Sequence, residues 1–125
     1  MYTLSLRREF TAAHSLIGGD WGAENERHSH RYRVEVHLEG AMLNEHGYLV
    51  DIVDVAATLD ALVARCRDRT LNELPEFRGI NPSIEHFARI LCEMFSDRFH
   101  AHTVSAITIR VWEDDTTWAS YRQEM

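Results

Sequence analysis

The sequence predicts an α+β domain in which a mostly antiparallel β-sheet is covered on one face by two helices. Two long segments near the start alternate apolar and polar residues, and two segments in the middle repeat apolar residues with helical spacing. The C-terminal part returns to strand-like patterns. Strands and helices are therefore grouped along the chain, which is typical of α+β domains and disfavours a parallel sheet. The uncovered face of the sheet must be solvated or buried by association.

The first two predicted strands lie on either side of a loop. Residues 2–16 place mostly apolar side chains at even positions, the period of a half-buried strand. Residues 17–27, "IGGDWGAENER", contain three glycines and predict a loop. The even positions become regular again from His28 to Leu38, alternating mainly with charged residues. Both strands are therefore expected to bury their even-numbered faces.

The middle of the chain changes from strand to helix. The stretch "NEHGYLVD" predicts a turn followed by a short third strand that ends near Asp51. Residues 52–66 then place their apolar side chains on one helical face. The polar, basic run "RCRDRT" ends this helix.

A second helix is expected to begin at "NPSIE". Asn81 can cap its N-terminus, and Pro82 suits the first helical position. Residues 103–113 predict another strand, and "TTWASYRQ" predicts a last edge strand after an acidic turn. The predicted order is β-β-β-α-α-β-β.

The composition limits the classes of function. With 125 residues the chain fits one domain, residues 1–125. The formal net charge of −7 disfavours a nucleic-acid partner, and no apolar run is long enough to span a membrane. All 13 basic residues are arginine, which excludes lysine Schiff-base chemistry. Cys66 and Cys92 form no CxxC motif, so we expect a reduced, cytoplasmic protein.

Three histidines are candidates for a metal site. If the first two strands are neighbours, His14, His28 and His30 project from the same face of the sheet. Three neutral imidazoles with an open fourth position are the ligand set of a catalytic zinc ion, whereas magnesium and calcium prefer oxygen ligands. Because the sequence contains eight histidines, a chance HxH pair remains the alternative.

Six stretches, taken in order, resemble the family of 6-pyruvoyltetrahydropterin synthase and 6-carboxytetrahydropterin synthase. They are "FTAAHSL", "ENERHSH", "GYLVDI", "TLNEL", "NPSIE" and "EDDTTWASY". The resemblance implies a tunnelling fold (T-fold), with four antiparallel strands and two helices in each subunit. It also implies trimers that close a continuous β-barrel and stack into a homohexamer. Such an assembly would bury the sheet edges and its second face.

The resemblance also implies a pterin-like ligand and a zinc cofactor. The zinc ligands would be His14, His28 and His30, and Glu113 would hold the pterin ring. A carboxylate can accept two parallel hydrogen bonds from the 2-amino and ring N–H groups of a pterin. The alternative for Glu113 is a solvated carboxylate in the acidic turn that it forms with its two aspartate neighbours.

The catalytic residues of the family are replaced in this sequence. Glu24 stands where family members have a catalytic cysteine, four residues before the HxH pair. Arg67 and Asp68 stand where they have an Asp-His pair, and neither cysteine of the chain matches the missing position. A positioned acid or base contributes about 10² to 10⁴ in rate. We therefore expect that the ordinary 6-pyruvoyl reaction is not performed.

Three functional hypotheses remain from the sequence. The preferred one is a pterin-binding homologue without the ordinary reaction. The second is a zinc-dependent lyase, because one variant of the family carries glutamate in place of the cysteine and cleaves the side chain of dihydroneopterin triphosphate. Glu24, with Asp68, would be catalytic there, although Glu26 competes for that role and a solvated Glu24 is an open alternative. The third is an oligomer with a purely structural role.

Overall fold

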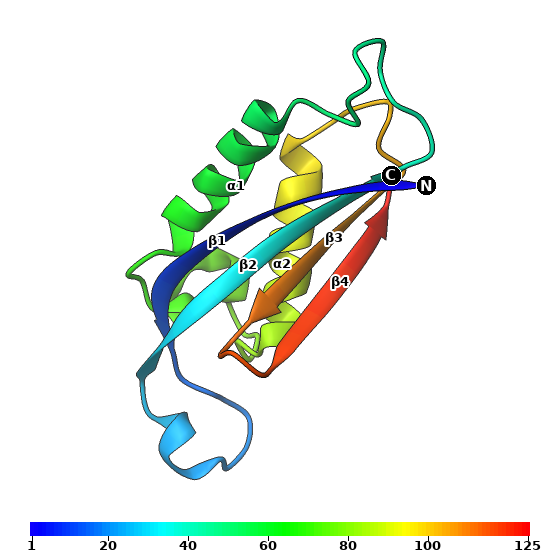
Figure 1. The fold of residues 1–125 in the computed structure, drawn as a ribbon. Helices are drawn as coiled ribbons and strands as arrows, with labels where there is room; N and C mark the ends of the chain where they lie inside the picture. Colours follow the sequence, from blue (N-terminus) through cyan, green and yellow to red (C-terminus); the bar gives the residue numbers. More distant parts are fainter.

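Four antiparallel strands lie in chain order across one sheet, and two helices cover one of its faces (Figure 1). The computed structural model describes all 125 residues. The strands are β1 (Tyr2–His14), β2 (His28–Gly40), β3 (Ala106–Trp112) and β4 (Trp118–Glu124), and the helices are α1 (Ile52–Cys66) and α2 (Ile84–Arg98). Three short 3-10 helices complete the chain: η1 (Gly22–Asn25), η2 (Leu71–Glu73) and η3 (Pro75–Phe77). The predicted α+β fold is confirmed, and the bounds of α1 agree with the prediction.

The predicted third strand before Asp51 is wrong, because residues 41–51 form turns instead. The Asn44 side chain accepts hydrogen bonds from the backbone N–H groups of His46 and Tyr48 at 2.9 and 3.0 Å. Gly47 adopts a φ of 83°, a left-handed conformation that glycine tolerates. These local hydrogen bonds use backbone N–H groups that a strand would offer to a neighbouring strand. The observed order of strands and helices is therefore β-β-α-α-β-β, with one strand fewer than predicted.

The predicted start of the second helix is also wrong, by two residues. The side chain of Ser83 accepts a hydrogen bond from the His86 N–H at 3.1 Å, so Ser83 is the N-cap and α2 begins at Ile84. Asn81 does not cap the helix, because its side-chain oxygen accepts from the Ile17 N–H at 2.9 Å. Pro82 consequently precedes the helix. A contact with a distant loop has replaced the local cap.

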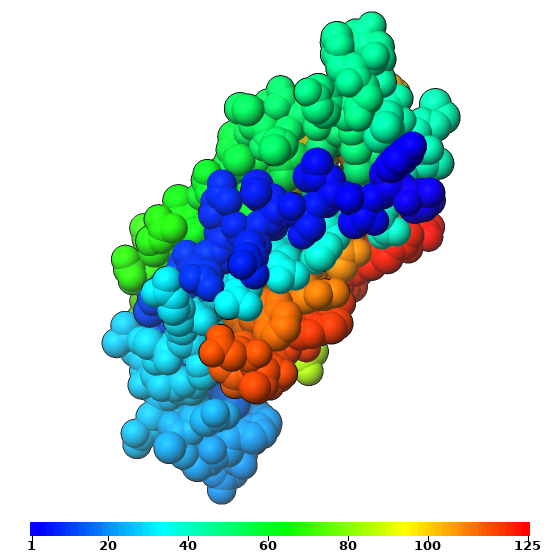
Figure 2. All heavy atoms as spheres, viewed as in Figure 1, coloured from blue at the N-terminus to red at the C-terminus, as the bar shows by residue number.

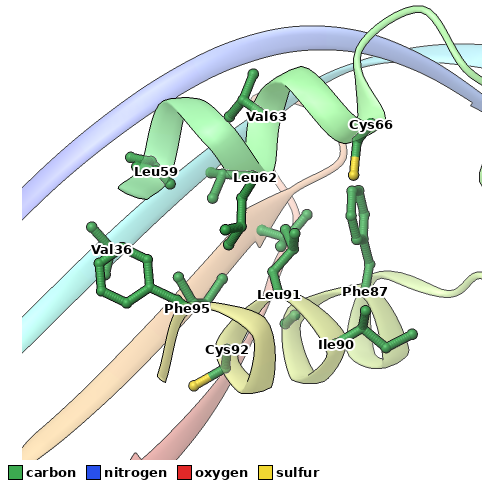
Figure 3. Close-up of a cluster of buried hydrophobic side chains, with 14 of the residues drawn as sticks. Val36, Leu59, Leu62, Val63, Cys66, Phe87, Ile90, Leu91, Cys92 and Phe95 are labelled. Atoms are coloured by element: carbon green, nitrogen blue, oxygen red, sulfur yellow. The ribbon is translucent and has the colours of Figure 1, made fainter. Parts of the chain in front are cut away.

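The core lies between the sheet and the two helices. The even-numbered residues of β2 from Tyr32 to Leu38 are fully buried, as the alternation predicts. They pack against apolar side chains of α1 and α2, and Figure 3 shows the facing side chains of the two helices. Cys66 and Cys92 belong to this core, and burial raises the pKa of the Cys66 thiol to about 12. Neither helix is long and apolar enough to cross a lipid bilayer.

The other face of the sheet carries charged side chains and is open in the single chain. Glu35, for example, lies 3.1 Å from His37 Nε2 and 3.5 Å from a guanidinium nitrogen of Arg110. Figure 2 shows this face, with side chains of all four strands on it. The outer edge of β4 has no neighbouring strand, and that of β1 is open except near its C-terminal end. There the Ala13 N–H donates to the Arg69 carbonyl at 2.9 Å. Unpaired strand edges are sites at which another chain can add to a sheet.

Candidate metal centre and ligand pocket

The register of β1 and β2 brings the three histidines together. His14 lies directly opposite His28, and Ala12 lies opposite His30, so all three imidazoles emerge from adjacent positions on one face. One nitrogen from each ring lies within 4.8 Å of the others. The Nε2 atoms of His14 and His28 are 2.9 Å apart. The predicted cluster is therefore confirmed.

Backbone carbonyls set the orientation of two of the rings. His14 Nδ1 lies 2.9 Å from the carbonyl oxygen of Pro82, and His28 Nδ1 lies 2.8 Å from that of Glu26. A carbonyl oxygen only accepts, so each Nδ1 carries the proton and each Nε2 presents a lone pair. Metal-ligating histidines have this arrangement, in which the second nitrogen donates to a carbonyl or carboxylate.

The donor set fits a metal ion such as zinc. Two lone pairs at 2.9 Å repel each other unless a cation lies between or beside them. The Nε2 atom of His30 is buried and makes no hydrogen bond. A tetrahedral zinc ion bound at about 2.0–2.1 Å requires nitrogens about 3.4 Å apart, which is within the observed spread. The three side chains would hold the ion and leave one coordination position open.

The surroundings of His14 favour its neutral imidazole. His14 is 1% exposed, and burial lowers its pKa despite the opposing hydrogen bond to Pro82. The hydroxyl of Tyr32 lies 3.2 Å from His14 Nδ1, and burial of this tyrosine raises its pKa strongly. The Tyr32 ring also packs edge-on against Phe87, with ring centroids 5.2 Å apart. The floor of the centre is thus part of the apolar core, and it limits the access of water.

Glu113 lies beside the histidines, at the end of the buried row of β3. Its carboxylate oxygen Oε1 is 3.1 Å from His30 Nε2 and 3.8 Å from His14 Nε2. Ile107, Ile109 and Val111 precede it on the same face and are fully buried, as the parity predicts. The Glu113 side chain is 27% exposed and lines an open cavity of about 420 Å³ together with His30.

Glu24 lies on the loop next to the centre but does not contact it. It belongs to η1, and its side chain is exposed and makes no hydrogen bond or ion pair. Its charge acts on His14 by raising the pKa of the imidazole slightly. Its backbone oxygen accepts a hydrogen bond from the Leu16 N–H at 3.0 Å, which folds the loop back towards the end of β1. Glu26 contributes its carbonyl to His28, and its side chain is exposed.

Asp68 lies in a turn after α1 and not among the histidines. Its φ is 59°, and the N–H of Arg69 donates to the carbonyl of Cys66 across the turn at 3.2 Å. The third residue of such a turn needs a positive φ, which aspartate tolerates better than most residues. The Asp68 side chain is exposed and makes no hydrogen bond or ion pair. Its observed role is to shape this turn.

Two asparagines that the sequence reasoning did not assign to the site hold the segment after His14. The Asn72 side chain accepts from the Ser15 N–H at 2.9 Å and donates to the Ser15 carbonyl at 2.8 Å. Asn81 accepts from the Ile17 N–H at 2.9 Å. Both belong to stretches that carry the family resemblance, "TLNEL" and "NPSIE". Their presence in these stretches could have indicated that they belong to the site.

The family model described as 6-pyruvoyl tetrahydropterin synthase matches residues 3–124. The chain belongs to this family. Its His14, His28 and His30 cluster resembles the zinc site of the family. A comparison with curated proteins gives no match.

Solved structures of the family share the fold at low sequence identity. The 6-pyruvoyl tetrahydropterin synthase of Caenorhabditis elegans superposes with a TM-score of 0.86 at 20% identity, over 98% of this chain and 96% of that chain. The Plasmodium falciparum synthase gives 0.82 at 15% identity, over 99% and 98%. A Plasmodium vivax synthase in which a catalytic glutamate is replaced by alanine gives 0.70 at 15% identity, over 100% of both chains.

Proposed function

We propose that the protein binds a reduced pterin beside a zinc ion and does not perform the ordinary 6-pyruvoyl reaction. The observation that carries the proposal is the position of the Glu113 carboxylate, 3.1 Å from a histidine of the metal cluster and on the wall of a cavity. The two carboxylate oxygens of Glu113 would then bind the pterin ring, and the metal would bind the side chain of the same ligand. Family membership over residues 3–124 supports a pterin as that ligand.

Each group has a distinct task in binding. Glu113 would accept two N–H groups of the pterin ring, a pairing in which the charged acceptor strengthens both hydrogen bonds. His14, His28 and His30 would hold the zinc, which would polarise an oxygen of the ligand side chain. The ordinary reaction also needs a base and a proton relay. Cys66 and Cys92 are buried, and burial raises the pKa of both thiols, so neither supplies the missing base.

The alternative function is a lyase in which Glu24 is the base. It is favoured by the Plasmodium vivax synthase, whose catalytic residue is a glutamate, and by the loop that brings Glu24 close enough to influence His14. In this reaction Glu24 removes the proton of the 2′-hydroxyl of a dihydroneopterin-type ligand. The C1′–C2′ bond then breaks, its electron pair enters the pterin ring, and C1′ is protonated. Asp68 would assist proton transfer only if its turn approached the ligand.

We also propose a homohexamer, as two stacked trimers. The open outer edge of β4, and the open part of the β1 edge that precedes Thr11, support edge-to-edge association of three sheets. The charged face of each sheet would then line the inside of the barrel.

Calorimetric titration with 7,8-dihydroneopterin and biopterin tests the proposed function. Glu113→Gln removes the charge and one acceptor, and it should weaken binding roughly 10- to 100-fold, the value of charged hydrogen bonds. Asp115→Asn is the matched control, because Asp115 lines the same cavity without an ion pair. Equal affinity of Glu113→Gln and the unmodified protein would exclude Glu113 as the anchor. Release of 6-hydroxymethyl-7,8-dihydropterin would identify the lyase.

A further inference from the structure

The segment that follows α1 lies along the outer edge of β1, next to the metal centre. We call residues 68–72 the docking segment. The Ala13 N–H donates to the Arg69 carbonyl at 2.9 Å, and Ala13 and Thr70 form a parallel bridge. This edge of β1 is the one that faces away from β2. The docking segment therefore pairs with the end of β1 at the residue directly before His14.

The side chain of Asn72 continues this pairing on the other side of His14. Its amide accepts a hydrogen bond from the Ser15 N–H at 2.9 Å and donates one to the Ser15 carbonyl at 2.8 Å. A neighbouring strand uses the backbone groups of a residue in the same way, one N–H and one carbonyl. The two residues that flank His14, Ala13 and Ser15, are thus both held by the docking segment.

Leu71 anchors the docking segment in the core. Its side chain is fully buried, and it directly precedes Asn72. The Arg69 N–H also donates to the Cys66 carbonyl at 3.2 Å, which ties the segment to the end of α1. Because a packed core permits little displacement, the position of the Asn72 amide is tied to that of the core.

The docking segment also reaches the strand that carries the other two ligands. The Thr70 hydroxyl accepts a hydrogen bond from Arg27 Nε at 2.7 Å. Arg27 directly precedes His28, the first residue of β2. One short segment therefore contacts the chain beside His14 and beside His28, and it acts on their backbone positions and not on their rings.

A metal site requires that its ligands stay within about 0.5 Å of the productive geometry, and a ligand ring moves with its own backbone. We propose that Asn72 and Thr70 are positioning residues of the metal centre. They hold the chain beside His14 and His28, so that the ligand nitrogens keep the spacing that zinc requires. Each of these contacts lies within one chain and needs no second subunit. The inference rests on the zinc centre of the proposed function and not on its pterin.

Titration of the metal-free protein with zinc tests the role of Asn72, at a temperature at which circular dichroism shows every variant to be folded. Asn72→Ala should weaken zinc binding about tenfold, the lower end of the range for groups that orient metal ligands. Asn44→Ala is the matched control, because it also removes two hydrogen bonds from a side chain to backbone N–H groups. Asn44 lies in the turns that follow β2, at the end of the sheet opposite to the metal centre (Figure 1). Its variant should keep the zinc affinity of the unmodified protein.

Thr70→Val tests the second contact, and it decides the outcome if Asn72→Ala does not fold. It keeps the shape of the side chain but removes the acceptor for Arg27, so zinc affinity should fall severalfold, and Thr70→Ser should restore it. Cobalt(II) gives a further readout, because its visible absorption depends on coordination geometry. Asn72→Ala and Thr70→Val should alter this spectrum, whereas Asn44→Ala and Thr70→Ser should not.

The outcomes separate this inference from the proposed function. Unchanged zinc affinity and an unchanged cobalt spectrum in either variant would overturn the role of the residue that it replaces, and the zinc centre would stand. An equal loss of affinity in Asn44→Ala would attribute the effect to stability and would also overturn the inference. Absence of zinc binding by the unmodified protein would instead remove the zinc centre of the proposed function, and this inference with it.

Discussion

Replacing His14 by alanine tests whether zinc binding depends on the three histidine ligands or on the fold around them. The variant loses one of three ligands and also the hydrogen bond to the Pro82 carbonyl. His86→Ala is a matched control, because His86 Nδ1 lies 2.7 Å from the carbonyl of the neighbouring Asn81 but does not belong to the cluster. Each variant should lose about 1–3 kcal/mol in the free energy of unfolding without metal, the cost of leaving a carbonyl unpaired.

Zinc should distinguish the two variants. A ligand that binds only the folded state at roughly 100 times its Kd stabilises that state by about 2.7 kcal/mol. For a chain of this size that corresponds to a rise in Tm of roughly 10 °C. We expect this rise in the unmodified protein and in His86→Ala, and none in His14→Ala.

The assay is thermal unfolding with and without zinc, combined with metal analysis of protein purified without a histidine tag or chelator. An equal zinc content and an equal Tm shift in His14→Ala would refute the three-histidine site. Loss of the shift in His86→Ala as well would show that the effect depends on the scaffold and not on the ligands.

Three further predictions concern the surroundings of the site. Glu24→Gln should abolish any side-chain cleavage while the affinity for 7,8-dihydroneopterin stays within about twofold, and turnover at the original rate would exclude Glu24 as the base. Asn72→Ala should lower the free energy of unfolding by about 1–3 kcal/mol, measured in urea, because both backbone groups of Ser15 lose their partners; an unchanged urea midpoint would contradict this. Asp68→Gly should raise stability by about 1 kcal/mol, since glycine adopts a φ of 59° without strain, and a loss of ligand turnover would show that Asp68 is more than a turn residue.

The histidine cluster was predictable because strand periodicity is a local property. The alternation fixes which side chains share a face, and the pairing of His14 with His28 then follows from a hairpin of neighbouring segments. The helical period likewise predicted α1 from Ile52 to Cys66. The proximity of Glu113 to His30 depends on the pairing of β3 with β2, which joins segments far apart in the sequence. No local pattern contained that pairing.

The two errors in the elements have the same physical origin. Asn81 was expected to cap a helix, but its side chain binds the loop at Ile17, and Ser83 takes over the cap. The stretch before Asp51 has strand-like composition, but the Asn44 side chain and Gly47 close turns there. In both cases an asparagine side chain accepts a hydrogen bond from a backbone N–H group, and the composition of the segment does not show which group that is.

Glu24 and Asp68 were assigned to the site by family resemblance alone, and their catalytic roles stay predictions.

The contacts of His14 span two very different distances along the chain. His28 is 14 residues away, whereas Pro82, whose carbonyl orients the ring, is 68 residues away. During folding, the hairpin can gather the three nitrogens early, because closing a short loop costs little entropy. The burial of His14 and the orientation of its ring by Pro82 must wait until the distant segment has docked. Tight metal uptake would then mark the completion of the tertiary structure. A chain with a misplaced segment 72–82 would keep its histidines close together but would leave His14 exposed to water, without the burial that lowers its pKa.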